Sequence, residues 1–348
     1  MAKAQVSKTA RRRMALDAQA GALVPSVEPA RPGKAQRESD RQFDLFVPLM
    51  RDMSLRDQRE TMERPFFSLQ KRKRLKPIEY RSSDGEVWVK VEAIPAYGMA
   101  TIWDADIIIW AASVINQLKS QGQNDLPRQL KTTVYDLLRA VHRDTGGKGY
   151  QELRAALDRL STTTIFTSIR AKRGRDSRFS WLDSWSVEID PVSDKPNGIV
   201  ITLSDWVYDG IIADKSLLSM HADYFEISGG LDRALYRIAR KHAGDQADGW
   251  TCRASILHEK SGSDSAPKEF NRMLRRIVDE NALPEYDVSW VRAGDGSAAV
   301  HFVRRSAVER TRLRAELAAE EQRLARRREE DERMRAVDER MSQLRASK

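Results

Sequence analysis

The order of hydrophobic patterns along the chain constrains its fold more than any other feature. Between residues 103 and 160, three segments space their apolar residues as amphipathic helices do, and after Ser161 the spacing changes to the alternation of β-strands. The same succession occurs again between residues 228 and 305. The sequence therefore predicts an α+β fold of two tandem winged helix-turn-helix units, in which three helices precede a hairpin.

The elements of the first unit have the following ranges. A hairpin about Asp84-Gly85 comes first, because alternating runs flank this favoured turn dipeptide. Helices are predicted over 103–120, 130–147 and 148–160, with Gly146-Gly147 ending the second. The strands "TTTIFTSIR" and "RFSWLDSWSVEID" follow, joined by the basic stretch "RAKRGRDSRF", and "GIVITL" is a third strand.

The second unit repeats the order with different residues. Helices are predicted over 228–244, 252–262 and 265–281, and a hairpin over 286–305 turns at Gly294-Asp295-Gly296. No sequence identity between the two units is visible, only the same succession of elements. The predicted domains are a disordered basic arm (1–42), an N-terminal winged-helix domain (43–222), a C-terminal winged-helix domain (223–305) and a charged C-terminal helix (306–348).

The amino-acid composition limits the kinds of partner that this chain is expected to bind. Lys and Arg number 60 against 51 Asp and Glu, and the pI is about 9.6, which favours a phosphate-bearing partner unless the basic tails alone raise the count. The single cysteine, Cys252, is interpreted as a small core residue and fits the reducing cytoplasm. The longest apolar run, Ile107 to Ile115, is about half the length that a bilayer requires, so no membrane partner is expected.

The third helix of each unit is the candidate element for reading DNA. Arg and Asn are the side chains that pair bidentately with guanine and adenine in the major groove. On the 265–281 helix, Lys268, Asn271, Arg272 and Arg275 fall together opposite the apolar face, and Lys148, Gln151 and Arg154 do so on the 148–160 helix. An ordinary solvated face is the alternative, and the order of the surrounding elements favours the DNA interpretation.

The hairpins are candidate backbone contacts. The stretch from Arg170 to Arg178 holds five basic side chains and one acid. The phosphates of double-stranded DNA would neutralise these positive charges and so offset their mutual repulsion. The predicted contacts in this first wing are Arg170, Lys172, Arg173, Arg175 and Arg178. In the second wing, 292–304, the predicted contact is Arg292.

Enzymatic interpretations find no support in the sequence. "TGGKGY" lacks the residues of a phosphate-binding loop, since His142 stands where a glycine and Gly149 where a hydroxyl is needed. The five histidines are scattered without metal spacing, so neither a metal site nor a cofactor is expected. The chain is therefore predicted not to be an enzyme.

Long stretches of the sequence resemble a known family. They are "RQFDLFVPLMRDMSLRDQRETMERPFFSLQKRKR", "TIWDADIIIWAASVI", "GYQELRAALDRLSTTTI" and "LHEKSGSDSAPKEFNRMLRRIV". In these stretches, from about residue 43 to 305, the chain resembles the replication initiator protein A (RepA-type) proteins of bacterial plasmids.

The resemblance implies tandem winged helices that bind double-stranded origin repeats, help to open the duplex, and recruit the host helicase or its loader. It also implies autoregulation, with dimers repressing the protein's own gene. Two alternatives stay open. One is a winged-helix transcriptional repressor with no origin function, and the other is an interaction protein that acts through its charged C-terminal helix.

Overall fold

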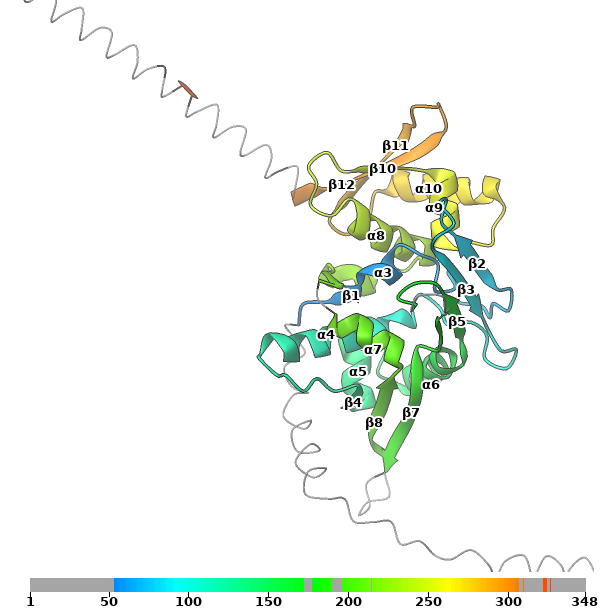
Figure 1. Ribbon diagram of the computed structural model, residues 1–348, viewed down its shortest axis with the longest axis vertical. Helices are drawn as coiled ribbons and strands as arrows, with labels where there is room; N and C mark the ends of the chain where they lie inside the picture. Colours follow the sequence, from blue (N-terminus) through cyan, green and yellow to red (C-terminus); the bar gives the residue numbers. More distant parts are fainter. Residues whose placement is uncertain are drawn as a thin grey trace, which may run out of the picture. The chain divides into compact units, whose positions relative to one another are not determined.

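The computed structural model describes residues 53–171, 177–189, 196–213, 215–306, 309, 322–323 and 326. The predicted arm at 1–42, the start of order near residue 43, and most of the charged segment after residue 306 lie outside the described residues. Helices and strands alternate along the described chain, with four separate sheets (Figure 1).

The first half contains one repeat of helices and a three-stranded sheet. Its elements are α4 (Ala105–Ser120), β4 (Gln129–Thr132), α5 (Val134–Ala140), α6 (Gly147–Thr162), β7 (Leu182–Ile189) and β8 (Pro196–Leu203). The sheet has the order β4-β8-β7 and is antiparallel throughout. The strand that lies between the first two helices thus pairs with the last strand of the hairpin.

The second half contains the same succession with the same pairing, except that its hairpin follows the third helix directly, whereas two strands of another sheet precede β7 in the first half. Its elements are α8 (Gly230–His242), β10 (Trp250–Arg253), α9 (Ala254–Ser261), α10 (Pro267–Glu280), β11 (Tyr286–Arg292) and β12 (Ala298–Arg304). The sheet order is β10-β12-β11, with Trp250 opposite Phe302 and Trp290 opposite Val300. The expected hairpin over 286–305 is confirmed, with Gly296 in the left-handed region at φ 80°.

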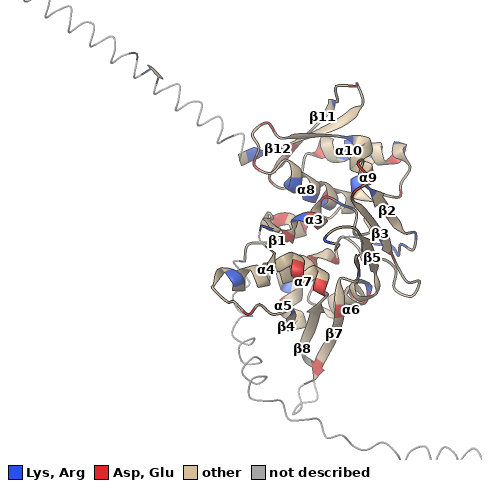
Figure 2. Ribbon diagram, viewed as in Figure 1, with Lys and Arg blue, Asp and Glu red and all other residues tan. Residues whose placement is uncertain are grey.

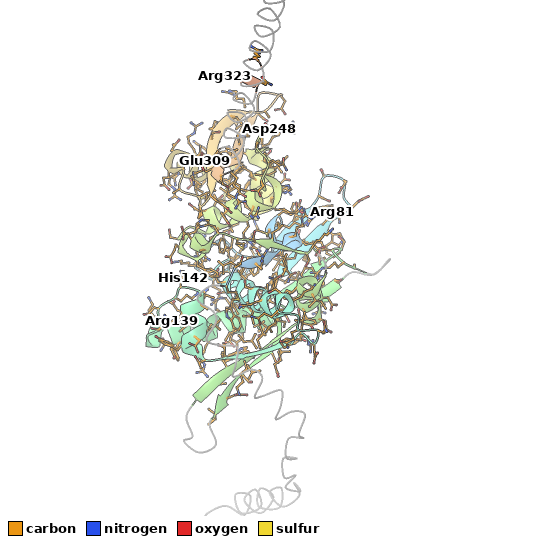
Figure 3. The ribbon with its side chains drawn as sticks, turned by 90° about the vertical axis from the view of Figure 1, so that its left-hand side faces the viewer. Arg81, Arg139, His142, Asp248, Glu309 and Arg323 are labelled. Atoms are coloured by element: carbon orange, nitrogen blue, oxygen red, sulfur yellow. The ribbon has the colours of Figure 1, made fainter. Side chains whose placement is uncertain are left out.

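The strands on either side of the basic stretch 170–178 belong to a separate, four-stranded sheet. Its order is β2 (Ile78–Arg81), β3 (Trp88–Glu92), β5 (Thr164–Thr167) and β6 (Ser177–Phe179). The Asp84-Gly85 hairpin is confirmed by pairing of Ile78 with Val91. Its turn is closed by Arg81, labelled in Figure 3, whose Nη1 donates to the carbonyl of Gly85 at 3.2 Å.

The expected single strand over 178–190 is wrong, because the chain changes sheets within it. Residues 177–179 pair with β5, whereas β7 begins at Leu182 and pairs with β8. Between them, Trp181 is fully buried, stacks on Phe67 at 4.4 Å between ring centroids, and donates its backbone N–H to Leu160. The basic hairpin therefore belongs to the sheet of β2 and β3, and β7–β8 is the hairpin that pairs with β4 (Figure 1).

The six main helices lie where the periodicity predicts them. Five have shorter bounds, whereas α6 extends beyond the predicted 148–160 at both ends. The helices predicted to begin at residues 130 and 252 begin later, because residues 130–132 and 252–253 belong to the strands β4 and β10. The helix predicted over 130–147 ends at Ala140, because His142 turns into the left-handed region at φ 54°. Gly146-Gly147 therefore do not end that helix: Gly146 is the N-cap of α6.

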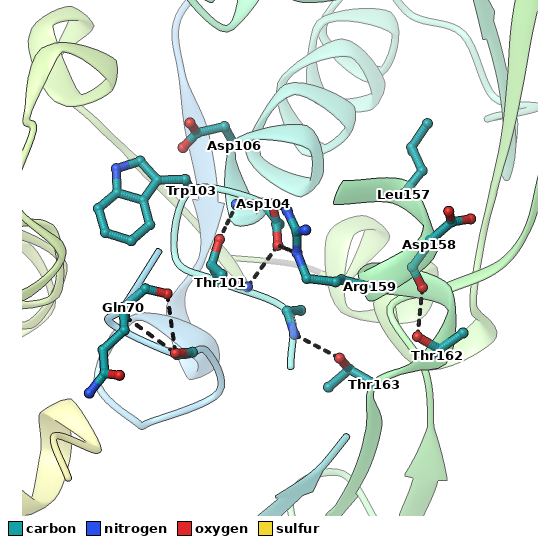
Figure 4. Close-up of polar contacts among 12 residues, drawn as sticks. Gln70, Thr101, Trp103, Asp104, Asp106, Leu157, Asp158, Arg159, Thr162 and Thr163 are labelled. Carbon is teal, nitrogen blue, oxygen red and sulfur yellow. Dashed lines mark hydrogen bonds and ion pairs between the residues drawn. The ribbon is translucent and has the colours of Figure 1, made fainter. Parts of the chain in front are cut away.

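The entry to α4 is tied to the end of α6. Asp104, fully buried, accepts two hydrogen bonds from Arg159, at 2.7 and 2.8 Å, and a third from the backbone N–H of Thr101 (Figure 4). The neighbouring Thr163 accepts from the backbone N–H of Ala100 at 2.8 Å. Because carboxylate–guanidinium hydrogen bonds satisfy the buried charge on both sides, this contact fixes α6 against α4.

Helix α8 connects the two halves through buried arginines. Arg237 donates to Asp57 of β1 (Arg56–Gln58) at 2.8 Å, and Arg233, one turn earlier, donates to Asp106 of α4 at 2.6 Å. All four side chains are buried. Apolar residues from both sides of residue 222 pack in one buried core. The predicted domain boundary at residue 222 therefore falls within a packed region, and it stays a prediction. The remaining elements are α3 (Arg59–Met62), α7 (Asp205–Ile212), β9 (Leu217–Ser219) and the 3₁₀ helix η2 (Ala222–Glu226).

Candidate nucleic-acid interface

Helix α10 presents the basic face that its sequence predicts. Its apolar side buries Phe270, Leu274 and Ile277, which leaves the opposite side in solvent. All four predicted contacts on this helix are exposed: Lys268, Asn271, Arg272 and Arg275. The blue segments of Figure 2 show the cations on α8 and α10.

The two arginines on this face are held in different ways. Arg272 donates to Glu269 through Nε at 2.9 Å and Nη2 at 2.6 Å, an exposed pair one helical turn apart. Arg275 lies over the ring of Trp290 on β11, with its guanidinium carbon 4.6 Å from the ring centroid. Exposed ion pairs of this kind contribute little to stability, so a phosphate or a base can displace Glu269.

The face of α6 is also exposed but carries less charge. Lys148, Gln151 and Arg154 are in solvent, and Lys148 lies 3.7 Å from Glu152. Arg154 lies over Trp185 of β7, 5.9 Å from the ring centroid. The indole Nε1 of Trp185 donates to Asp158 at 3.2 Å, so the tryptophan is tied to the helix.

Arg170 is not placed as a free cation at a hairpin tip. Its guanidinium lies 3.6 Å from the ring centroid of Trp206, donates to the carbonyl of Trp206, and pairs with Glu60 at 2.7 Å. Burial lowers the pKa of Arg170, and the charges of Glu60 and Asp209 offset part of that effect. We therefore regard Arg170 as an anchor of the β5 end, and its predicted DNA contact has no support from this geometry.

The other hairpin residues divide into two groups. Arg178 on β6 is exposed and lies 5.2 Å from the ring of Phe166, and Arg292 on β11 is exposed with a hydrogen bond of 3.1 Å to Gly296. Lys172, Arg173 and Arg175 lie outside the described residues. Their predicted contact with DNA stays a prediction.

A basic strip that the sequence analysis does not single out contacts the turn before α10. We use this name for residues 71–76, "KRKRLK", which hold five cations and no acid. Next to the strip, Gln70 donates to Asp264, and within it Arg74 donates to the carbonyl of Gly262 at 2.7 Å, both in the α9–α10 turn. Lys71, Arg72 and Lys76 are exposed. The charge run was the available signal, although only the fold brings it to this turn.

The described part of the chain offers no metal centre. Within it, no group of three His, Cys, Asp or Glu side chains is arranged to hold an ion. Among the described residues, no helix combines the length and apolar content needed to cross a bilayer.

Comparisons with known proteins place the chain in a family. Residues 56–288 match the model of the family Replication initiator protein A. A protein of Wigglesworthia glossinidia brevipalpis, described as "Putative replication protein", is 33% identical over 241 residues, which are 68% of this chain and 85% of that protein.

Two crystal structures of domains 2 and 3 of RctB are also similar. One covers 69% of this chain and 95% of its own, with a TM-score of 0.47 and 14% identity. The other covers 71% and 98%, with a TM-score of 0.44 and 14% identity.

Both sequence comparisons identify the same class of protein, one of replication. The chain belongs to the replication initiator protein A family. The resemblance stated from the sequence is thereby confirmed.

Proposed function

We propose that this protein initiates plasmid replication by binding double-stranded repeats at an origin, as a non-enzymatic, sequence-specific DNA-binding protein. In this proposal it helps to open the duplex, recruits the host helicase or its loader, acts in the cytoplasm, and represses its own gene as a dimer. Family membership supports the role in initiation.

One observation carries the DNA-binding part of the proposal. Apart from β5 and β6, which stand between α6 and β7 and pair in the sheet of β2 and β3, the succession helix–strand–helix–helix–strand–strand occurs twice. In both three-stranded sheets the first strand is paired with the last. A winged helix-turn-helix places its third helix in the major groove and its hairpin on the backbone. The repeated topology therefore supports α6 and α10 as recognition helices, and β7–β8 and β11–β12 as wings.

The basic strip and the β5–β6 connection would supply contacts without sequence information. Phosphate contacts position a protein on the duplex, whereas base contacts specify the sequence. Because the strip contacts the turn before α10, its exposed lysines would meet the backbone that flanks the groove entered by α10.

The proposal is tested by selecting bound fragments from the replicon that carries this gene, at about physiological salt. Enrichment of direct repeats beside the gene, followed by their ability to replicate autonomously, is the expected result. A single inverted repeat at a promoter would favour the repressor instead. Absence of any enrichment would show that the basic surfaces bind phosphate without reading sequence.

Two variants separate the proposed roles on the selected repeat. Arg272→Ala should weaken specific binding by ~1–3 kcal/mol if its guanidinium leaves Glu269 for a base. Lys76→Ala should weaken binding to selected and random DNA alike and lower the salt slope by about 1. Equal losses on both DNAs for Arg272→Ala would contradict its assignment as a base contact.

A further inference from the structure

The two third helices share a short sequence that becomes visible once their buried faces are aligned. With Arg154 set against Arg275, "LRAALD" at 153–158 corresponds to "LRRIVD" at 274–279. In this register the buried positions of one helix coincide with those of the other. These positions are Leu153, Ala156 and Leu157 in α6, and Leu274, Ile277 and Val278 in α10.

The first strand of each following hairpin shows the same correspondence. Trp185 of β7 follows Ser184, and Trp290 of β11 follows Ser289. Each tryptophan lies opposite a β-branched residue of the central strand of its sheet, Ile201 in β8 and Val300 in β12. The tryptophans therefore occupy equivalent places in the two repeats.

Each tryptophan contacts the arginine of its own repeat. The guanidinium carbon of Arg275 is 4.6 Å from the Trp290 ring centroid, and that of Arg154 is 5.9 Å from the Trp185 centroid. Nine such contacts occur among the described residues, so either of these two alone would mean little. The informative observation is that these two share one helix register and one strand position.

The small energy of such a contact suggests that the tryptophan ring serves to orient the arginine guanidinium. At an exposed site a cation–π contact contributes little to the stability of the folded chain. Its strength is comparable to the rotamer entropy that an arginine loses when a ligand fixes it. A ring that fixes the guanidinium beforehand reduces this loss on binding.

We propose that Arg154 and Arg275 are equivalent base-reading arginines and that Trp185 and Trp290 are the residues that position them. Because a guanidinium pairs bidentately with guanine O6 and N7, the DNA site would present one guanine to each repeat. This inference rests on the proposed function, and it adds the specificity-determining pair in each half.

The two pairs should differ in strength. The Arg275 contact is shorter, whereas the Arg154 contact lies near the outer limit of about 6 Å for such interactions. In addition, Asp158 accepts a hydrogen bond from Trp185, which places a carboxylate beside the first pair. The larger loss of specificity is therefore expected from changes in α10 and β11.

A double-mutant cycle on the selected repeat tests the positioning role. Trp290→Leu should weaken binding to the repeat about three- to fivefold and binding to random DNA less than about twofold, while Trp290→Phe, which keeps a ring face, retains most of the affinity. Arg275→Ala should cost less affinity in the Trp290→Leu background than in the wild type, because the orientation of its guanidinium is already lost there. Trp88→Leu on β3, in another sheet, is the matched control, and thermal melting verifies that every variant folds.

Methylation interference at guanine N7 tests the paired assignment. For the wild type, methylation of two guanines in the repeat should block binding. In Arg275→Ala the interference at one of them should vanish, and in Arg154→Ala the interference at the other. Arg275→Lys, which keeps the charge without the planar fork, should behave as Arg275→Ala does at that guanine.

The outcomes distinguish this inference from the proposed function. Additive losses in the cycle, or equal losses from Trp290→Leu and Trp88→Leu, would overturn the inference while specific binding by the wild type upholds the function. A wild type that prefers no fragment at all would overturn both.

Discussion

At the scale of single residues, the least expected feature is that arginines form part of the core. Arg233 and Arg237 occupy the same side of α8, each with a buried carboxylate partner from the first half of the chain. Sequence patterns assign arginine to solvent, because a buried charge is costly unless it is paired. The partners, Asp57 and Asp106, are far away in sequence, so no local pattern reveals them.

Removing one member of such a pair should be strongly destabilising. Arg237→Ala leaves the Asp57 carboxylate buried without its counter-charge and should lower the free energy of unfolding by ~3–5 kcal/mol. Arg276→Ala, which removes an exposed arginine 3.9 Å from Asp232, should change it by less than ~1 kcal/mol. Urea unfolding of both variants checks this, and a loss below about 1 kcal/mol for Arg237→Ala would contradict the buried pairing.

A second charged cluster gives stability a pH dependence. Glu63 lies 2.9 Å from His242, 3.0 Å from Arg64, 3.2 Å from Lys260 and 3.7 Å from Lys241. Burial alone would raise the pKa of Glu63, but the hydrogen bond from His242 and the charges of Arg64, Lys260 and Lys241 lower the pKa well below its usual range.

The sign of the dependence follows from this lowered pKa. The Glu63 carboxylate stabilises the folded state above its ordinary pKa of 4.5, and this contribution is lost as the pH falls below that value. Glu63→Gln should therefore be less stable than the wild type at pH 7, with a difference that shrinks below pH 4.5. A constant difference in the free energy of unfolding across this range would contradict the assignment.

At the scale of elements, two glycines in the first turn of α6 have different roles that the sequence does not distinguish. A Cβ on Gly149 would lie 1.8 Å from the carbonyl oxygen of Asp144, whereas a Cβ on Gly147 would meet nothing within 4 Å. The close approach lets the loop after α5 pack on the first turn of α6. The stretch "TGGKGY", expected as a turn between two helices, instead supplies the N-cap and the first turn of α6.

Alanine substitutions should separate these two roles. Gly149→Ala forces the Asp144 loop to move and should destabilise the protein by ~1–3 kcal/mol, the usual cost of overpacking. Gly147→Ala should be neutral or stabilise by ~0.4–1 kcal/mol, since it reduces the freedom of the unfolded chain. Thermal denaturation of the two variants measures the difference, and equal midpoints would show that α6 does not depend on this approach.

The period of the apolar residues predicts that most of the helices and strands exist, but it does not predict which strands pair with each other. The periodicity located α6 and α10 because each buries one stripe of a helix, whereas α4 and α8 are buried on nearly all sides over most of their length. It did not reveal that β6 and β7 belong to different sheets. The break at Trp181 depends on stacking with Phe67, which lies more than a hundred positions earlier.

At the scale of the whole molecule, the reactivity of the single cysteine measures how often the folded chain opens. Cys252 is 5% exposed on β10, and burial raises the pKa of its thiol to about 11, although Lys260 and Arg253 partly counter the shift. The expectation from sequence that it is a small core residue is confirmed.

Thiol labelling under native conditions should accordingly be slow. At pH 7–8 the buried, protonated thiol should react at least about a hundredfold more slowly than the same thiol in denaturant, because the thiolate is the reactive form. The rate should rise in urea in parallel with loss of tertiary structure. Rapid labelling of the native protein would mean that β10 opens independently of the core.

The repeated order of helices and hairpins, the basic character of the α10 face and the family can all be read from the amino-acid sequence. The first two are local properties, since the period of apolar residues and the run of charges depend on near neighbours alone. Three further facts appear only in the folded chain: which hairpin pairs with β4, how Arg170 is held against Trp206 and Glu60, and that Trp185 and Trp290 contact equivalent arginines. Those facts depend on contacts between residues far apart in the chain, and the physical reason is that burial and ion pairing are satisfied in space and not along the sequence.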